Sequence, residues 1–546
     1  MINFIIHHDK KQEKSWEIKE IPAWVSQKGA SALDNKQIYV DKTDMLYELV
    51  RGPNKVFLAR PRRFGKSLLL STIASLFADG VRHFEGLAIE KLWKDKKYRV
   101  LQLDFSNITN FDDVAQFESA FRCMLSARFE PLGFKASGID NRFMAELSLW
   151  LSNQPSNALV LLIDEYDAPL TQVLHNQALF DGVQKVLREF FNILKTNDGC
   201  FRLLFLTGIT RFSHTSIFSG FNNLNDISLD PDFGGLLGYT ETELELYYSE
   251  FIDSAAQKLQ LSRKALLAKL REYYDGFSFD SDGSTHVYCP WSILKFFAAS
   301  QKKFFSKDAR FENYWFNSGG QPAVLMNYLA QRKLEKPLNF FETICMDPTK
   351  LLSSAPYHEM DINLLLLQTG YLTIRSVDEV GGLYLGYPNR EVASSMALLY
   401  AKVMVHDSEF TPQPVLIHLV RGETEPTVLF FNRVLNALDY ERYPIKDEAS
   451  FKGALQILFI GLSLNPQVEV HTAKGRSDLE VSVGAYHWVF ELKFAKSQGS
   501  ASQLCDQAVA QIREKDYGNT PHGKELKRVA LVFDEDQRQI IEWNEI

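Results

Sequence analysis

Apolar residues follow two alternating patterns in the first part of the chain. Short continuous apolar runs are typical of strands buried on both faces of a parallel sheet, and longer stretches with apolar residues every three or four positions are typical of amphipathic helices. The predicted strands are Lys55–Ala59, Tyr98–Phe105, Ala158–Asp167 and Phe201–Thr207. The predicted helices are Val114–Phe129, Phe143–Leu151 and Leu179–Lys195. This alternation predicts an α/β fold with a doubly wound parallel sheet, whose ligand binds beyond the carboxyl ends of the strands.

Changes in this pattern divide the chain into four predicted regions. Residues 1–238 are expected to form the parallel-sheet domain, and residues 239–334, which are helical and aromatic, a helical lid. Residues 335–440 form a connecting region, and residues 441–546 a second, smaller α/β domain. The elements predicted in this last domain are helices at Ser450–Leu464 and Leu504–Lys515, a hairpin between them, and a closing strand at Arg528–Phe533.

The loop after the first strand has the chemistry of a phosphate-binding loop. Gly65, Lys66 and Ser67 stand where a helix begins, so backbone N–H groups and the helix dipole face an anion. Lys66 is expected to reach the β- and γ-phosphates of a nucleotide, and Ser67 to place its hydroxyl on Mg²⁺. The first glycine of the general motif is replaced by Arg60, so the loop is expected to take its own path, stiffened by Pro61.

Three arginines in this loop, Arg60, Arg62 and Arg63, are expected to bring further cations within reach of the same phosphates. The alternative is a basic surface loop in front of an ordinary helix. A second element further along the chain favours phosphate binding.

That element is the apolar strand that ends in Asp164 and Glu165. Asp164 is expected to hold Mg²⁺ in its outer coordination sphere, and Glu165 to polarise the attacking water. Thr207 or Thr210 is the candidate sensor of the γ-phosphate, and Arg211 is a candidate phosphate contact, with an ordinary structural ion pair as the alternative. Together these elements predict an NTPase of the additional-strand type. They do not distinguish ATP from GTP, because the loop reads phosphates rather than the base.

The C-terminal region carries a second constellation. Asp478, Glu491 and Lys493 have the spacing D-x12-E-x-K. If Gly484-Ala485 forms a two-residue hairpin turn, Asp478 lies opposite Glu491, with Lys493 on the same face. Opposed carboxylates repel each other unless a cation lies between them, so a divalent metal is expected there, with Lys493 positioning water or stabilising phosphorane charge.

Two glutamates flank this predicted hairpin. Glu448 and Glu469 are candidates for a further metal ligand. The alternative is an exposed hairpin with a surface ion pair between Lys493 and Asp478.

Composition narrows the possible partners. The chain has 546 residues and a net charge of −8. Its five cysteines are scattered, which favours a reducing compartment and a cytoplasmic location. No apolar run is long enough for a membrane span. Residues 441–546 contain 13 Lys and Arg against 16 Asp and Glu, so contact with nucleic acid depends on local patches rather than on a basic domain.

Several segments together resemble a known family. These are YVDKT (Tyr39–Thr43), RPRRFGKS (Arg60–Ser67), LLIDEYDAPL (Leu161–Leu170), TGITRFS (Thr207–Ser213), YCPWSI (Tyr288–Ile293) and GRSDL with ELK (Gly475–Leu479, Glu491–Lys493). The chain resembles bacterial AAA-ATPase-like proteins fused to a C-terminal PD-(D/E)xK nuclease domain, a family that itself carries Arg at the first glycine position. The resemblance implies ATP binding and hydrolysis coupled to a Mg²⁺-dependent nuclease. A role in defence or mobile-element biology follows only by association.

Three functional hypotheses follow. The first is an enzyme in which ATP gates a nuclease that acts on nucleic acid, with DNA favoured over RNA. The second is a nucleotide-dependent switch whose nuclease-like domain only binds nucleic acid or protein. The third is an assembly ATPase that works as a homo-oligomer, with Arg211 or a loop arginine acting on a neighbour's nucleotide.

Overall fold

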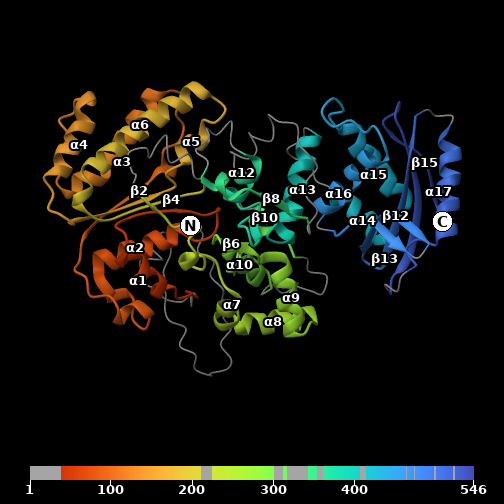
Figure 1. The fold of residues 1–546 in the computed structure, drawn as a ribbon, viewed down its shortest axis with the longest axis horizontal. Helices are drawn as coiled ribbons and strands as arrows, with labels where there is room; N and C mark the ends of the chain where they lie inside the picture. The colour runs from red at the N-terminus through yellow and green to blue at the C-terminus, as the bar shows by residue number, and fades with distance from the viewer. Residues whose placement is uncertain are drawn as a thin grey trace. The chain divides into compact units, whose positions relative to one another are not determined.

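The computed structural model describes residues 38–210, 224–300, 311–316, 342–352, 361–405, 413–462, 464–472, 474–496, 500–519 and 523–546. The chain divides into two compact units. The first comprises residues 1–328 and 341–389, and the second residues 329–340 and 390–546. Figure 1 shows the elements of both units.

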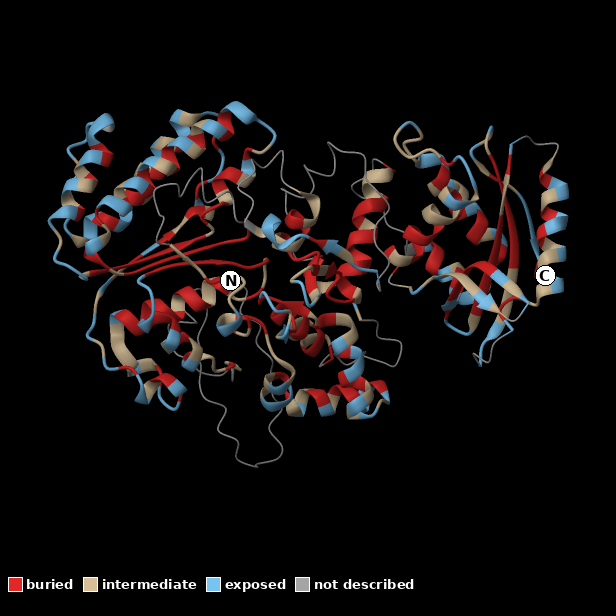
Figure 2. Ribbon diagram, viewed as in Figure 1, coloured by how far each residue is buried: buried red, intermediate tan, exposed pale blue. Residues whose placement is uncertain are grey.

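The core of the first unit is a five-stranded parallel sheet. Its strands are β1 (Lys55–Ala59), β2 (Arg99–Asp104), β3 (Leu159–Asp164), β4 (Phe201–Gly208) and β5 (Asn225–Asp226). Their order is β2-β3-β4-β1-β5, and each neighbouring pair is parallel. Every residue of β1 and β3 is buried, as the continuous apolar runs predicted (Figure 2). Because β4 lies between β1 and β3, the prediction of an additional-strand arrangement is confirmed.

Helices cover both faces of this sheet. They are α1 (Thr43–Arg51), α2 (Lys66–Asp79), α3 (Val114–Phe129), α4 (Phe143–Ser152), α5 (Ala168–Gln172) and α6 (Gln177–Thr196). Figure 1 shows α1 and α2 on one face and α3, α4 and α6 on the other. The buried stripe of α6 includes Val183, Leu187 and Phe191, which confirms that its apolar periodicity marks a core face. The predicted doubly wound α/β fold is therefore confirmed.

The other described residues of the first unit form mainly helices, with short strands. The helices are α7 (Glu241–Tyr247), α8 (Ser249–Leu259), α9 (Arg263–Tyr274), α10 (Pro290–Ser300) and α12 (Ile362–Thr369). The strands are β6 (Phe277–Ser278), β7 (His286–Val287), β8 (Ile344–Met346), β9 (Thr373–Val377) and β10 (Leu383–Gly386). Tyr248, Ile252, Leu266 and Leu270 belong to one buried cluster, so most of the aromatic and apolar side chains of this region serve as its core.

The second unit is built on a five-stranded mixed sheet. Its strands are β11 (Gln467–Thr472), β12 (Gly475–Val483), β13 (Tyr486–Ala495), β14 (Glu525–Asp534) and β15 (Gln539–Glu545), in that order. Its helices are α13 (Arg390–Met404), α14 (Gln413–Arg421), α15 (Thr424–Ala437), α16 (Glu448–Gly461) and α17 (Ala501–Lys515). Strands β13 and β14 are parallel and are joined through α17, whereas the other pairs are antiparallel. The sheet and its helices confirm the prediction of a second α/β domain.

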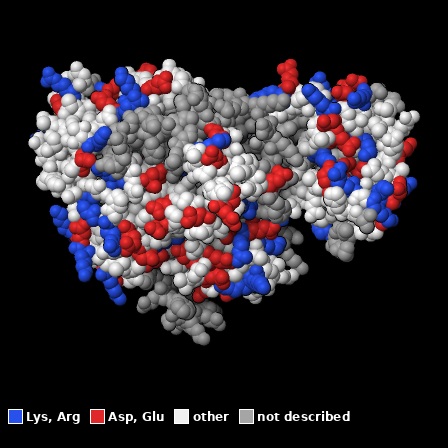
Figure 3. Space-filling view, in the orientation of Figure 1, with Lys and Arg blue, Asp and Glu red and all other residues white. Residues whose placement is uncertain are grey.

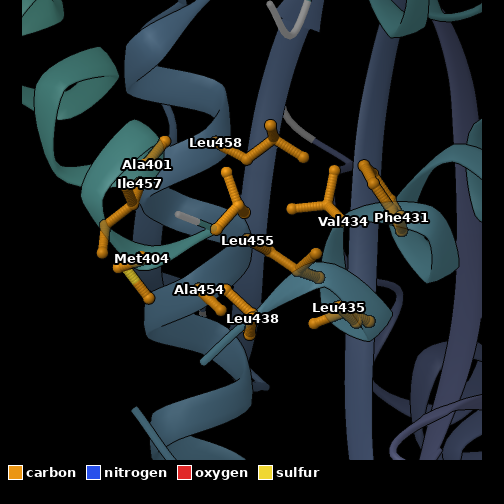
Figure 4. Close-up of a pocket in the computed structure, with 11 residues that line it drawn as sticks. Ala401, Met404, Phe431, Val434, Leu435, Leu438, Ala454, Leu455, Ile457 and Leu458 are labelled. Carbon is orange, nitrogen blue, oxygen red and sulfur yellow. The ribbon is translucent and has the colours of Figure 1, made fainter. Parts of the chain in front are cut away.

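Helices α14 and α15 complete the core of the second unit. Leu419 and Phe431 from these helices share a buried cluster with Leu479, Trp488 and other residues of the sheet. The unit therefore begins well before residue 441, and the four-region division of the chain stays a prediction. A cavity of about 20 Å³ between α13, α15 and α16 is lined only by apolar side chains (Figure 4). An apolar cavity of this size has no polar partners for a water molecule and is a packing defect rather than a ligand site.

None of the helices among the described residues is long and apolar enough to cross a lipid bilayer.

The first unit contains a buried carboxylate with an elevated pKa. Asp275 follows α9, and its side-chain Oδ1 has no hydrogen-bond partner among the described residues. Burial, with a smaller contribution from Glu241, raises the pKa of Asp275 to about 6, against the opposing effects of the Gly276 N–H and Arg271. The folded protein thus binds more protons than the unfolded chain between about pH 4 and pH 6, and its stability falls as pH rises through this window.

We therefore expect Asp275→Asn to gain stability relative to the wild type as pH rises from 4 to 6.5. The gain should be on the order of 2 kcal/mol, because the amide carries no charge to desolvate. Urea unfolding at several pH values measures the difference. Asp232→Asn, at an exposed position, is the control. A difference between Asp275→Asn and wild type that stays constant with pH would contradict this assignment.

Candidate functional site

The start of α2 and the carboxyl ends of β3 and β4 meet at the carboxylate of Asp164. Ser67 Oγ, at the start of α2, donates to Asp164 Oδ2 over 2.6 Å. Thr207 Oγ1, near the end of β4, donates to Asp164 Oδ1 over 2.5 Å. Adjacent parallel strands carry their carboxyl ends to one edge, which brings residues distant in sequence together. Of the two candidate sensor residues, Thr207 is the one in contact with Asp164.

Thr210 belongs to a different contact. Its backbone N–H and hydroxyl donate to Asp167 Oδ2, over 2.8 Å and 2.7 Å. The same oxygen accepts the Ile209 N–H over 3.0 Å. Asp167 thus holds the backbone that follows β4 in place, and the hydroxyl of Thr210 contributes one of these structural hydrogen bonds. Arg211, the candidate phosphate contact, lies outside the described residues.

Glu165 takes an unusual backbone conformation beside Asp164. Its φ is 47°, in the left-handed region that non-glycine residues rarely adopt, and its N–H donates to Asp164 Oδ1 over 3.0 Å. Burial raises the pKa of Glu165, the nearby charge of Lys66 lowers it, and the Asp164 and Asp167 carboxylates raise it further. A carboxylate with raised basicity at this position has the chemistry of a proton acceptor.

The loop between β1 and α2 alternates in backbone handedness. Arg63 has φ 72° and Gly65 has φ 99°, with Phe64 between them. Such an alternation turns successive N–H groups toward one concavity, which binds anions. Phe64 anchors the loop by edge-on contacts with Phe277 and Phe279, at centroid distances of 4.9 and 5.0 Å.

The side chain of Lys66 is folded back into this loop. Its Nζ donates to the carbonyl oxygens of Arg60 (2.9 Å) and Pro61 (3.1 Å), and the residue is buried. Burial lowers the pKa of Lys66, against the opposing charges of Asp164, Glu165 and Asp167. The ammonium therefore lies within the loop itself, where a bound phosphate would compete with two carbonyl groups for it.

Arg60 does not behave as the predicted phosphate ligand. Only 1% of its surface is exposed, and its guanidinium donates to the carbonyls of Ala59, Ser228 and Phe233. It also lies 4.5 Å from the ring centroid of Phe279. The expected phosphate contact of this side chain is therefore corrected: Arg60 links β1 to the segments after β5.

The other two loop arginines are less deeply buried. Arg63 stacks on Trp291 at 4.3 Å from the ring centroid, and burial lowers its pKa. The carbonyl of Arg62 accepts the indole N–H of Trp315 over 3.1 Å. Aromatic side chains of the lid region thus hold the loop from the outside, and the predicted phosphate contacts of Arg62 and Arg63 stay predictions.

Two cavities adjoin this loop. One, of about 120 Å³, is lined by Gly65 and the first turns of α2, by residues 38–40, Lys42 and Leu46, and by Leu236–Tyr239 and Pro290. Its walls are mainly apolar, as in pockets that take a flat ring system. The other is a groove of about 720 Å³ that opens at Ser67 and Asp164 and runs along β2.

In the second unit the predicted hairpin register is confirmed. Val483 pairs with Tyr486, Val481 with Trp488 and Leu479 with Phe490, around the turn at Gly484, whose φ is 57°. All of these side chains belong to, or pack against, one buried cluster. The next opposed positions outward are Asp478 and Glu491, the two predicted carboxylates.

The predicted acidic pair and Lys493 come together at this point. Asp478 Oδ2 accepts the backbone N–H of Leu492 over 2.9 Å, and Lys493 Nζ donates to Glu491 Oε1 over 2.8 Å. Burial, and then the charge of Asp478, raise the pKa of Glu491 to about 7, although Lys493 opposes the shift. Burial lowers the pKa of Lys493, but the contact with Glu491 and the neighbouring carboxylates outweigh this effect and raise it.

The two further ligand candidates differ in their surroundings. Glu448, at the start of α16, has Oε2 4.0 Å from Lys493 Nζ, and burial raises its pKa, with Asp478 adding to the effect. Glu469 instead pairs with both Lys452 and Arg476. Sequence reasoning missed Lys452, whose Nζ also lies 3.6 Å from Asp478 Oδ1. Its position one turn after Glu448 was the available signal.

No three His, Cys, Asp or Glu side chains in the described ranges converge closely enough to hold a metal ion. Lys452 and Lys493 lie between the carboxylates instead. The donor set nevertheless fits a divalent cation. Glu491 is 1% exposed, and its Oε2 has no hydrogen-bond partner among the described residues. An orphaned carboxylate oxygen beside Asp478 is the kind of hard ligand that Mg²⁺ prefers.

Comparisons with known proteins match both regions. Residues 30–218 match the family described as "Predicted AAA-ATPase", and residues 446–543 match the PD-(D/E)XK nuclease superfamily. A protein of Azotobacter chroococcum mcd 1, "Uncharacterized protein in vnfD 5'region", is 28% identical over 525 residues, which cover 92% of this chain and 94% of that protein. The fusion of the two domain types, expected from the motifs, is therefore confirmed. Domains of these types generally use a nucleotide and a divalent metal.

The position of Arg60 leads to a test of the loop. We expect Arg60→Gly, which restores the general motif, to destabilise the first unit by about 2–4 kcal/mol, because buried carbonyls lose their donors. Thermal and urea unfolding measure the change. Arg51→Ala, at an exposed helix end, should stay within about 0.5 kcal/mol of the wild type. An unchanged or increased stability of Arg60→Gly would show that the guanidinium is not a structural link.

Proposed function

We propose that this chain, in which an AAA-ATPase-like domain is fused to a PD-(D/E)XK nuclease-like domain, is an ATP-hydrolysing protein that gates a metal-dependent nuclease. The observation that carries the proposal is the assembly around Glu491, a buried carboxylate with an orphaned oxygen beside Asp478 and Lys493. A domain that only binds nucleic acid has no need for buried opposed carboxylates. The expected substrate is nucleic acid, with DNA favoured over RNA.

The first unit supplies the parts for nucleotide hydrolysis. Ser67 and Asp164 would hold Mg²⁺ with the nucleotide, and the N–H groups of the loop would cradle the phosphates. The two hydrogen bonds from Lys66 to loop carbonyls would keep the loop closed until a nucleotide enters. Lys66 would then donate to phosphate oxygens instead. Glu165 would accept a proton from the attacking water, and Thr207 would keep Asp164 in place.

The base of the nucleotide has a candidate position. The cavity of about 120 Å³ adjoins Gly65 and the first turns of α2, so a ring bound there lies next to the phosphate loop. Its walls combine residues 38–40 with Tyr239 and Pro290 from the lid region. Nucleotide binding would then link the lid to the loop, which is the physical basis of the proposed gating. ATP is the expected nucleotide on the resemblance alone.

The second unit supplies the parts for phosphodiester cleavage. Asp478 and Glu491 would hold a divalent cation, which supplies Lewis-acid chemistry and an activated water when bound, and Glu448 from α16 would have to move closer to serve as a third ligand. The raised pKa of Lys493 keeps its ammonium protonated, so it can stabilise charge that develops on a phosphate. The hydrogen bond from the Leu492 N–H fixes the orientation of Asp478.

A second candidate function is a nucleotide-dependent switch whose nuclease-like domain binds without cutting. The ion pairs of Lys452 with Asp478 and of Lys493 with Glu491 offset part of the negative charge without a metal. On the face of this unit that Figure 3 shows, acidic and basic side chains are interleaved. A role as an oligomeric assembly ATPase, and a role in defence or mobile-element biology, stay predictions from sequence.

The first experiment measures cleavage of single- and double-stranded DNA and RNA with Mg²⁺ or Mn²⁺, with and without ATP. We expect Lys493→Ala to lower cleavage at least 100-fold with ATP turnover intact, and Lys66→Ala to abolish ATP turnover and the ATP dependence of cleavage. Lys496→Ala, an exposed lysine just beyond β13, is the matched control. If ATP is hydrolysed but no substrate is cut, the switch is the better description.

Measurements of metal affinity can show whether Glu448 or Glu469 is the further metal ligand. We expect Glu448→Gln to weaken Mn²⁺ binding about tenfold, because the side chain lies near Asp478 and Glu491, and Glu469→Gln to change it less than about threefold. Electron paramagnetic resonance of free Mn²⁺ measures both affinities. The reverse order of effects would identify Glu469 as the ligand.

A further inference from the structure

Three neighbouring strands carry a row of carboxylates across the sheet of the second unit. The pairs Val468–Leu479 and Val470–Ser477 bracket Glu469 and Asp478, which places these two residues opposite each other on β11 and β12. Asp478 and Glu491 occupy the next opposed positions beyond Leu479 and Phe490. Asp478 thus stands in the middle of the row, with one gap toward Glu469 and another toward Glu491. Each gap is flanked by carboxylate oxygens, the type of ligand that Mg²⁺ and Mn²⁺ prefer.

The gap toward Glu469 is already filled by a cation. Lys452 Nζ donates to Glu469 Oε1 and lies 3.6 Å from Asp478 Oδ1. Only 16% of the Lys452 side chain is exposed, and Arg476 pairs with the second oxygen of Glu469. An ammonium held by two carboxylates at this distance repels a metal ion that approaches the same oxygens.

The gap toward Glu491 is different. Glu491 Oε2 is buried without a hydrogen-bond partner among the described residues, and Lys493 contacts only the other oxygen, Oε1. Glu448 lies on this side, with Oε2 4.0 Å from Lys493 Nζ. Glu491 Oε2 is therefore open to a ligand on this side. On the other side Glu469 Oε2 also lacks a hydrogen bond among the described residues, but Arg476 occupies it in an ion pair.

One helix creates this asymmetry. Asp447 caps α16, and Glu448 and Lys452 are separated by one turn, so both side chains project from the same helix face. The helix therefore delivers a carboxylate to the Glu491 side of Asp478 and an ammonium to the Glu469 side.

We propose that the nuclease-like site takes a single divalent cation, on the Glu491 side, and that the ammonium of Lys452 stands in place of a second one. Lys452 is then a positioning residue that holds Glu469 and sets the number of cations around Asp478. The inference rests on the proposed function, because it presupposes a metal site at Asp478 and Glu491.

Counting bound Mn²⁺ tests this inference. All proteins are the full chain with Asp164→Asn, so that the nucleotide site of the first unit does not contribute to the count. We expect one ion for this parent and two for Lys452→Met, the second binding at least tenfold more weakly. Lys452→Arg, which keeps the charge, should bind one. Adding Glu469→Gln to Lys452→Met should restore a count of one, because the second ion loses a ligand.

The outcomes separate the inference from the proposed function. Two ions in the parent, or one ion in both the parent and Lys452→Met, would overturn the proposed role of Lys452. Either result would leave the proposed metal-dependent nuclease standing. No ion in the parent, together with no cleavage by the wild type, would overturn the proposed metal-dependent nuclease itself. A cooperative thermal transition of each Lys452 variant, well above the temperature of the binding measurement, verifies that the counts compare folded proteins. If Lys452→Met is unstable, Lys452→Gln takes its place with the same expected count.

Discussion

The first unit depends on the two hydroxyl groups that hold the Asp164 carboxylate. Ser67 comes from the helix after β1, Asp164 ends β3, and Thr207 comes from β4, which lies between these strands. The two short hydrogen bonds therefore join three consecutive segments of the sheet edge. Ser67 and Asp164 are also among the residues that line the groove along β2. Any nucleotide chemistry at this edge requires that junction, because the loop alone supplies no carboxylate.

The loop between β1 and α2 is supported by residues outside the core of the sheet domain. Phe64, Arg63 and Arg62 are held by Phe277, Trp291 and Trp315, respectively, all from the region after residue 239. Arg60 reaches in the same direction, toward Phe279. A change in the position of these aromatic residues would shift the backbone of the loop, because they contact it directly or through its side chains. This contact offers a physical route between nucleotide binding and the lid region, without movement of the buried sheet.

The second unit concentrates charge where its sheet is most buried. Asp478 and Glu491 are 9% and 1% exposed, and their repulsion is relieved by Lys452 and Lys493. Burying such a network is unfavourable unless its members are paired, so the lysines are as necessary to the fold as to any chemistry. Because both lysines and Glu448 approach the same pair, small shifts of α16 would change the balance between internal ion pairs and a bound cation.

The sequence by itself determined β1 to β4 of the first sheet, the hairpin of β12 and β13, and β14. It also determined the main helices beside them and the two constellations of candidate residues, whereas β5, β11 and β15 were not predicted. Apolar periodicity is a local property, and a two-residue turn sets a hairpin register, so Asp478 and Glu491 could be paired without a structure. The tertiary structure alone decided three further points: that Arg60 is a buried link, that Thr207 rather than Thr210 contacts Asp164, and that Lys452 enters the acidic row. Each depends on how a helix or a distant segment packs against the sheet, and such long-range contacts leave no periodic signal in the chain.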